Sequence, residues 1–129
     1  MPWLMDDKRP IYIQIIEEIK LRIVTGIYLP GSKIPSVREL ASEANVNPNT
    51  MQKAFGELEL NGLIITQRTS GRTVTENKNL IEEIKKQMAE EEIQIFLDRM
   101  KQLGYQYEDT LELLNKEIKG GNYELNSNM

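Results

Sequence analysis

The chain has 129 residues, 40% hydrophobic and 28% charged, with a formal net charge of −4 and with neither cysteine nor histidine. This length and composition predict one compact domain with an appendage, and they exclude disulfides, thiolate chemistry and any metal ligand or general base supplied by histidine. No apolar run approaches the roughly 18 residues of a membrane span, no signal peptide is evident, and no catalytic arrangement is recognisable, so we expect a cytoplasmic protein that is not an enzyme and needs no cofactor or metal.

The first predicted element is a helix from Pro10 to about Thr25. Proline suits the first position of a helix, and Gly26 supplies a stop. Apolar residues recur at helical spacing, which predicts a scaffold helix with one buried face. These residues are Tyr12, Ile15, Ile16, Ile19 and Ile23.

Two helices joined by a tight turn are predicted between Ile34 and Gly62. Ser36 can cap the first, and Glu39 three residues later can complete a capping box. Asn45 tolerates the left-handed conformation that a tight turn needs. The apolar stripe of this helix is Val37, Leu40, Ala41 and Ala44.

The second helix of the pair has one apolar and one polar side. Asn47 can cap it, and Pro48 suits its first position. Its buried stripe is Met51, Ala54, Phe55 and Leu58, and at 100° per residue the opposite side carries Asn49, Gln52, Lys53 and Gly56. These polar groups suit base edges and phosphates, so the pattern predicts a helix-turn-helix that binds DNA. The alternative is a helical hairpin whose polar side merely meets water.

A β-hairpin is predicted next, with strands at 63–67 and 72–75 and a turn at 69–71. We expect Leu63, Ile65 and Val74 to pack it on the helices, because two short strands are not stable alone. Arg68 and Arg72 flank the turn, which favours contact with phosphates or the minor groove. An ordinary solvated hairpin is the alternative.

The acidic charge lies in the C-terminal part of the chain. Residues 1–77 hold nine basic and nine acidic residues, whereas residues 78–129 hold seven and eleven. A nucleic acid would therefore have to bind the first part, through a thin local basic face.

Two further helices are predicted, from Leu80 to about Leu103 and from about Glu108 to Lys119. Their stripes have too little protein around them to be buried, so we expect these helices to pair with a second copy; folding back on the N-terminal part is the alternative. We therefore divide the chain into a DNA-binding domain, 1–77, and a helical dimerisation and effector domain, 78–129, and any effector is expected at the dimer interface or between the domains. The predicted dimerisation residues are Ile81, Ile84, Met88, Ile93, Phe96, Leu97, Met100, Leu103, Leu111, Leu114 and Ile118.

Three stretches carry a resemblance to the GntR family of bacterial transcription regulators, specifically to its short YtrA-like branch. They are RPIYIQI, LPGSKIPSVRELA and VNPNTMQKAFGELELNGLI, followed by the wing-like QRTSGRTVT. The resemblance covers roughly Arg9 to Thr75 and implies an α+β, mainly helical fold: a winged helix-turn-helix with a β-hairpin wing, plus a small two-helix dimerisation domain.

The resemblance also implies a set of DNA contacts. Many relatives outside this branch have arginine where Pro48 and Gln52 stand, so those contacts cannot be carried over and the preferred operator must differ. The predicted DNA-binding residues are Ser36, Arg38, Asn47, Asn49, Thr50, Gln52, Lys53, Arg68, Thr69, Ser70, Gly71 and Arg72.

These observations predict a sequence-specific, homodimeric transcription regulator with a pseudo-palindromic operator in double-stranded DNA. The branch implies a repressor of its own operon, with genes for ABC transporters as frequent neighbours. No membrane contact is expected, and a small-molecule effector stays open. The alternative function is a winged-helix protein-interaction module that does not bind DNA.

Overall fold

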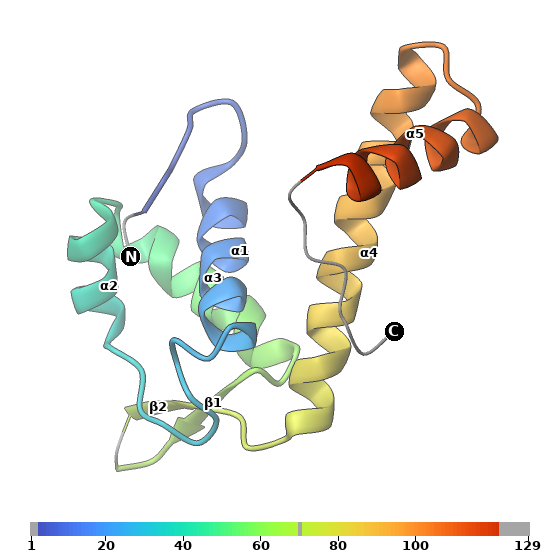
Figure 1. Cartoon of the computed structure of the whole chain (residues 1–129). Coiled ribbons are helices and arrows are strands. Elements are labelled where there is room, and N and C mark those ends of the chain that lie inside the picture. The colour runs from blue at the N-terminus through green and yellow to red at the C-terminus, as the bar shows by residue number, and fades with distance from the viewer. Residues whose placement is uncertain (1–2, 70, 122–129) are drawn as a thin grey trace. The chain divides into compact units, whose positions relative to one another are not determined.

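The computed structural model describes residues 3–69 and 71–121, so Ser70, predicted at the tip of the wing, lies outside the described residues. Its elements, in chain order, are α1 (Ile11–Val24), α2 (Val37–Ala44), α3 (Pro48–Leu60), β1 (Ile64–Gln67), β2 (Gly71–Val74), α4 (Lys78–Gln102) and α5 (Tyr107–Gly120) (Figure 1). This order confirms the predicted fold, three helices and a β-hairpin wing followed by two helices. None of the described helices is long and apolar enough to cross a membrane.

The packing divides the chain into two compact units, Met1–Lys86 and Gln87–Met129. The division follows packing and falls within α4. The functional boundary between 77 and 78 remains a prediction.

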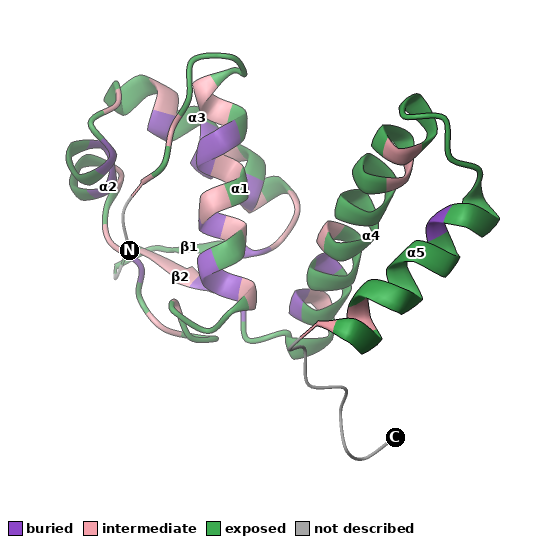
Figure 2. Cartoon of the chain, turned by 45° about the horizontal axis from the view of Figure 1, so that its top comes forward, coloured by how far each residue is buried: buried purple, intermediate pink, exposed green. Residues whose placement is uncertain are grey.

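In the first unit, α3 is the central element and packs against α1, α2 and β1. The apolar stripes meet there, and Figure 2 shows the buried residues where these helices face one another. Phe55, Ile15, Ile19, Met51 and Leu58 are all fully buried. The helical spacing that predicted each stripe is therefore what assembles this core.

The two helix starts and the turn between them have the predicted local contacts. Ser36 Oγ accepts a hydrogen bond from the Glu39 N–H, and the Glu39 carboxylate accepts one from the Ser36 N–H, both at 3.1 Å. Asn45 ends α2 in the left-handed conformation, with φ of 57°. The Asn47 side chain caps α3, and Pro48 occupies its first turn. These contacts fix where each helix begins, and so fix the angle of the turn.

The wing is a two-stranded antiparallel sheet in which Ile64 lies opposite Val74, and Thr66 lies opposite Arg72. The prediction that Ile65 packs on the helices is wrong, because Ile65 is 41% exposed whereas Ile64 and Val74 are each 1% exposed. The strand begins at Ile64, and cross-strand partners share one face of a sheet. The face toward α3 therefore carries the Ile64–Val74 and Thr66–Arg72 pairs.

The segment before α2 adds an unpredicted third line of pairing to the wing. The Ile34 N–H donates to the Arg72 carbonyl at 3.0 Å, and the Val74 N–H donates to the Ser32 carbonyl at 2.9 Å. Lys33 and Thr73 form the bridge between them. Strand β2 is thus paired along both of its edges, with β1 on one side and with residues 32–34 on the other.

The C-terminal helices contrast with this core. Ile81 and Ile84, at the start of α4, are buried. Of the described residues from Gln87 onward, Thr110 alone is buried, and its hydroxyl finds no hydrogen-bond partner there. Several of the apolar side chains remain at least 40% exposed: Ile93, Ile95, Phe96, Leu103, Leu111, Leu113 and Leu114. Taken by themselves, the described residues of the second unit, 87–121, form no apolar core.

Candidate nucleic-acid interface

The exposed side of α3 carries Asn49, Gln52 and Lys53, which we call the polar face. They are exposed because the opposite side of the helix fills the core. Thr50, also predicted at the interface, is half-buried at the edge of this face. The polar face therefore offers two amides and one ammonium group, without a carboxylate among them.

Asn47 lies just before α3, next to the polar face, and its side chain caps the helix. Its Oδ1 accepts a hydrogen bond from the Asn49 N–H at 2.8 Å. The side-chain NH2 of Asn47 can still donate to a phosphate oxygen. Asn47 is thus both the cap of α3 and a potential donor beside its N-terminus.

Helix α2 contributes Ser36 and Arg38, both exposed. The Ser36 hydroxyl oxygen accepts the capping bond, which leaves its proton available to donate. The pKa of Glu39 lies below its ordinary value, first because the Ser36 N–H donates to the carboxylate, then through the Ser36 side chain and the charge of Lys33. Glu39 therefore stays ionised as part of the capping box.

The tip of the wing is exposed at Arg68, Thr69 and Gly71. Gly71 has φ of 81°, in the region that favours glycine, and a Cβ there would lie 3.6 Å from Lys33 Cε. The Lys33 side chain thus runs beside the wing turn. Its place there depends on the pairing of Lys33 with Thr73, which joins segments 40 positions apart and does not follow from a local sequence pattern.

Arg72 differs from the other predicted contacts because it is already engaged. Its Nε donates to Glu59 Oε1 at 3.2 Å, and its guanidinium carbon lies 5.2 Å from the centre of the Phe55 ring. Its side chain is 25% exposed. Sequence reasoning missed Glu59, since the 13 positions that separate the pair are bridged only once the register of the wing is known.

Among the described residues, Arg38, Lys53 and Arg68 form none of the salt bridges, whereas Arg9, Arg22 and Arg72 each form at least one. Arg38, Lys53 and Arg68 lie on α2, on α3 and in the wing, the three elements predicted to meet DNA. No described group of three or more Asp and Glu side chains is arranged to hold a metal ion. The site is built for polar and anionic contacts.

A buried cation in α1 links this helix to α2. Arg22 of α1 is 3% exposed and donates to Glu18 at 3.0 Å, to Tyr28 Oη at 2.7 Å and to Glu43 of α2 at 3.0 Å. Its guanidinium carbon lies 4.4 Å from the centre of the Trp3 ring. This network joins α1, α2 and the segment before α1, and it gives Trp3 a role that the sequence did not indicate.

The network also changes proton affinities. Burial alone would lower the pKa of the Arg22 guanidinium, but its hydrogen bonds with Tyr28, Glu18 and Glu43 outweigh burial and raise it. The pKa of Glu43 lies below its ordinary value, chiefly because Trp3 Nε1–H donates to the carboxylate and Arg22 pairs with it. Both charges are therefore present at neutral pH.

Comparison with known proteins shows which family the chain is similar to. A model of bacterial regulatory proteins of the gntR family matches residues 11–74. The HTH-type transcriptional repressor YtrA of Bacillus subtilis (strain 168) is 39% identical over 116 residues, which cover 87% of this chain and 89% of that protein.

Two solved structures are also similar. A GntR family transcriptional regulator from Listeria monocytogenes has a TM-score of 0.79 and 41% identity, covering 87% of this chain and 98% of that chain. AraR(DBD), solved in complex with operator ORX1, has a TM-score of 0.50 and 35% identity, covering 58% of this chain and 90% of that chain. YtrA and the Listeria monocytogenes protein are named as transcription regulators, which agrees with the prediction that the chain is not an enzyme. The chain belongs to the GntR family of bacterial DNA-binding transcription regulators, in its short YtrA-like branch.

Proposed function

We propose that the chain is a homodimeric repressor that binds a pseudo-palindromic operator through α3 and the wing. The observation that carries this proposal is the polar face of α3, which projects amides and an ammonium group while its other side is buried. The complex of AraR(DBD) with an operator supports it, because that structure is similar to this chain at 35% identity.

The chemistry of the polar face suits direct readout. Asn49 and Gln52 carry amides, which can pair in bidentate fashion with the N6 and N7 edge of adenine in the major groove. Lys53, Arg38 and Arg68 would bind phosphates or the minor groove and hold the helix in register. The remaining predicted contacts, Ser36, Asn47, Thr50, Thr69, Ser70, Gly71 and Arg72, would complete the interface around the helix and the wing.

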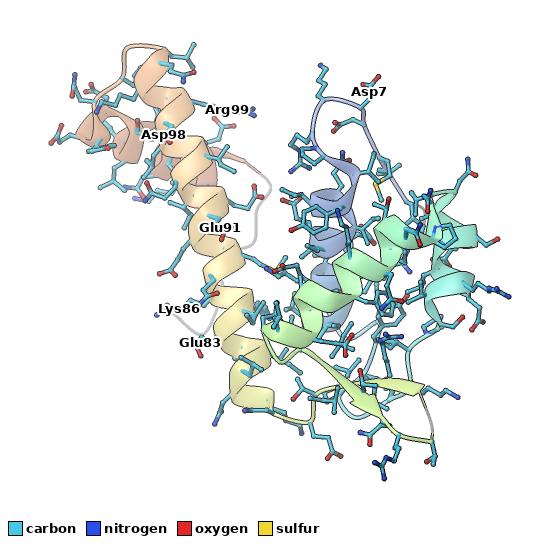
Figure 3. All side chains as sticks on the ribbon, turned by 180° about the vertical axis from the view of Figure 1, so that it is seen from behind. Asp7, Glu83, Lys86, Glu91, Asp98 and Arg99 are labelled. Carbon is cyan, nitrogen blue, oxygen red and sulfur yellow. The ribbon has the colours of Figure 1, made fainter. Side chains whose placement is uncertain are left out.

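Pairing of two copies would bury the exposed apolar surface of the second unit. Exposed contiguous apolar surface is typical of an interaction site. Charged side chains project from α4, as Figure 3 shows for Glu91, Asp98 and Arg99. In the second half of this helix, apolar residues recur at helical spacing and could pair with a second chain: Ile93, Phe96, Leu97, Met100 and Leu103. We infer that the predicted dimerisation residues of α4 and α5 pair with those of a second chain.

A two-fold axis would place two α3 helices in successive major grooves, with half-sites roughly 34 Å apart. Occupying a promoter would exclude the polymerase, and YtrA, the similar protein, is named a repressor. We propose that the chain acts in the cytoplasm on its own operon, which the branch links with ABC-transporter genes. Any effector would bind in the helical part.

Lys53→Ala is expected to weaken operator binding. Because log K falls as log salt concentration rises, the loss of one phosphate contact should also make this slope shallower, by about one per subunit. Lys53 is exposed on the polar face and forms no salt bridge with a described residue, so its loss removes a phosphate contact without disturbing the core. Fluorescence anisotropy across a salt series measures both changes.

The matched control is Lys86→Ala, which removes the same charge from an exposed position on α4. It should leave the slope unchanged. Equal slopes for the two variants would remove Lys53 from the interface. A wild-type protein that binds no duplex at any salt concentration, but co-purifies with another protein, would favour the interaction-module alternative.

A further inference from the structure

Glu59, near the end of α3, holds both strands of the wing. One carboxylate oxygen accepts a hydrogen bond from the Thr66 hydroxyl of β1, and the other accepts from Arg72 Nε of β2 at 3.2 Å. Thr66 and Arg72 lie directly opposite each other, and the next pair, Gln67 with Gly71, is at the turn. A single carboxylate therefore fixes the cross-strand pair one step from the turn to the helix that carries the polar face.

The wing needs such a tether. A two-stranded sheet is marginally stable in water, and beyond the buried Ile64 and Val74 the strands are mostly exposed. The pairing with Ser32–Ile34 holds the base of β2 but does not connect the wing to α3. Beyond the packing of β1 on α3, Glu59 links the outer part of both strands to this helix, and with its side chain 31% exposed the pairing is only partly screened by solvent.

The pairing also fixes the direction of Arg72. Its guanidinium is planar, with Nε bound to Glu59 and the carbon stacked 5.2 Å from the centre of the fully buried Phe55 ring. Its two terminal nitrogens make no hydrogen bond to a described residue. Because the fork of a guanidinium is rigid, holding one edge determines where the other edge points.

An acidic residue beside a DNA-binding surface opposes binding unless it does something that outweighs its repulsion of phosphate. Helix α3 carries a second such residue, Glu57, which is exposed and forms no side-chain hydrogen bond or salt bridge with a described residue. Glu57 and Glu59 therefore have the same charge on the same helix but different surroundings.

We infer that Glu59 is a positioning residue for DNA binding, which sets the wing against α3 and aims the free edge of Arg72 at a phosphate. The inference rests on the proposed function, and it assigns to an acid a favourable contribution to binding a polyanion.

Substitutions at Glu59 distinguish a positioning role from simple repulsion between its carboxylate and the DNA phosphates. Glu59→Ala should weaken operator binding about threefold to tenfold and reduce the magnitude of the salt slope by about one per subunit, and Arg72→Ala should do the same. Glu57→Ala, the matched control, should bind as tightly as the wild type or tighter, with an unchanged slope. The double variant Glu59→Ala/Arg72→Ala should show the slope of Arg72→Ala alone, because Glu59 acts through Arg72. Glu59→Gln keeps an acceptor for Arg72 and should restore most of the slope.

A second measurement needs no DNA. Amide hydrogen exchange in β1 and β2 of the free protein should be faster in Glu59→Ala than in Glu57→Ala. If Glu59→Ala binds as tightly as Glu57→Ala with an unchanged slope, or if the two variants exchange alike, Glu59 does not position the wing. A wild type that binds no duplex would overturn the proposed function and the aiming of Arg72 together, and exchange would then decide separately whether Glu59 holds the wing.

Discussion

Phe96→Asp is expected to make the protein monomeric and to weaken binding to a full operator by about a hundredfold or more. Phe96 is 40% exposed among the unpaired apolar side chains of α4. Across a two-fold axis each substitution occurs twice, and a carboxylate buried at such an interface without a partner is strongly unfavourable. Losing the second subunit removes the effective concentration that links two half-sites, typically worth about 10² to 10⁴ in affinity. Sedimentation equilibrium and anisotropy titration measure the two effects.

Gln94→Asp is the control, because it adds the same charge two positions earlier, on roughly the opposite side of α4. It should stay dimeric. Phe96→Asp should still bind a single half-site with the wild-type salt slope per subunit. A wild type that is already monomeric would contradict the account and would favour helices that fold back on the N-terminal part.

Arg22→Ala is expected to lower the free energy of unfolding by about 3 kcal/mol, at the lower end of the range for breaking a buried ion pair. The substitution leaves Glu18, whose side chain is 18% exposed, without its cation, whereas Glu43 is half exposed and can be hydrated. It also removes the link between α1 and α2, and the stacking with Trp3. Urea unfolding followed by circular dichroism at neutral pH measures the change.

Arg9→Ala tests whether burial is the cause. Arg9 pairs with Glu17, and both side chains are about half exposed, at 50% and 52%. Exposed pairs contribute roughly 0 to 1 kcal/mol, so this variant should differ little from the wild type. Equal losses for the two arginines would mean that the buried network does not stabilise the helix pair.

Local features of the fold could be predicted because their causes lie within a few residues. The capping box of Ser36 and Glu39, the left-handed Asn45 and the cap at Asn47 each join positions at most three apart. The apolar stripes of α1, α2 and α3 follow from helical spacing alone. For the same reason the polar face could be read from the sequence.

The contacts that join distant segments could not be predicted. Which of Ile64 and Ile65 is buried depends on where β1 begins, and a shift of one residue exchanges the two faces. The pairing of Arg72 with Glu59 needs the wing register, and that of Arg22 with Glu43 needs the packing of α1 against α2. By residue type alone these four charged side chains would be placed on the surface. In the structure, the pair of Arg72 and Glu59 organises the wing, and the pair of Arg22 and Glu43 joins the helices that support the interface.

The central claim is that two copies of α3 read an inverted repeat, and selection of bound sequences from random duplex DNA tests it most directly. The wild type should enrich an inverted repeat with half-sites about one helical turn apart. Asn49→Ala should enrich the same spacing with relaxed preference at one symmetric pair of positions, because Asn49 is exposed on the polar face. Enrichment of no repeat by the wild type, or an identical preference at every position for Asn49→Ala, would contradict the account.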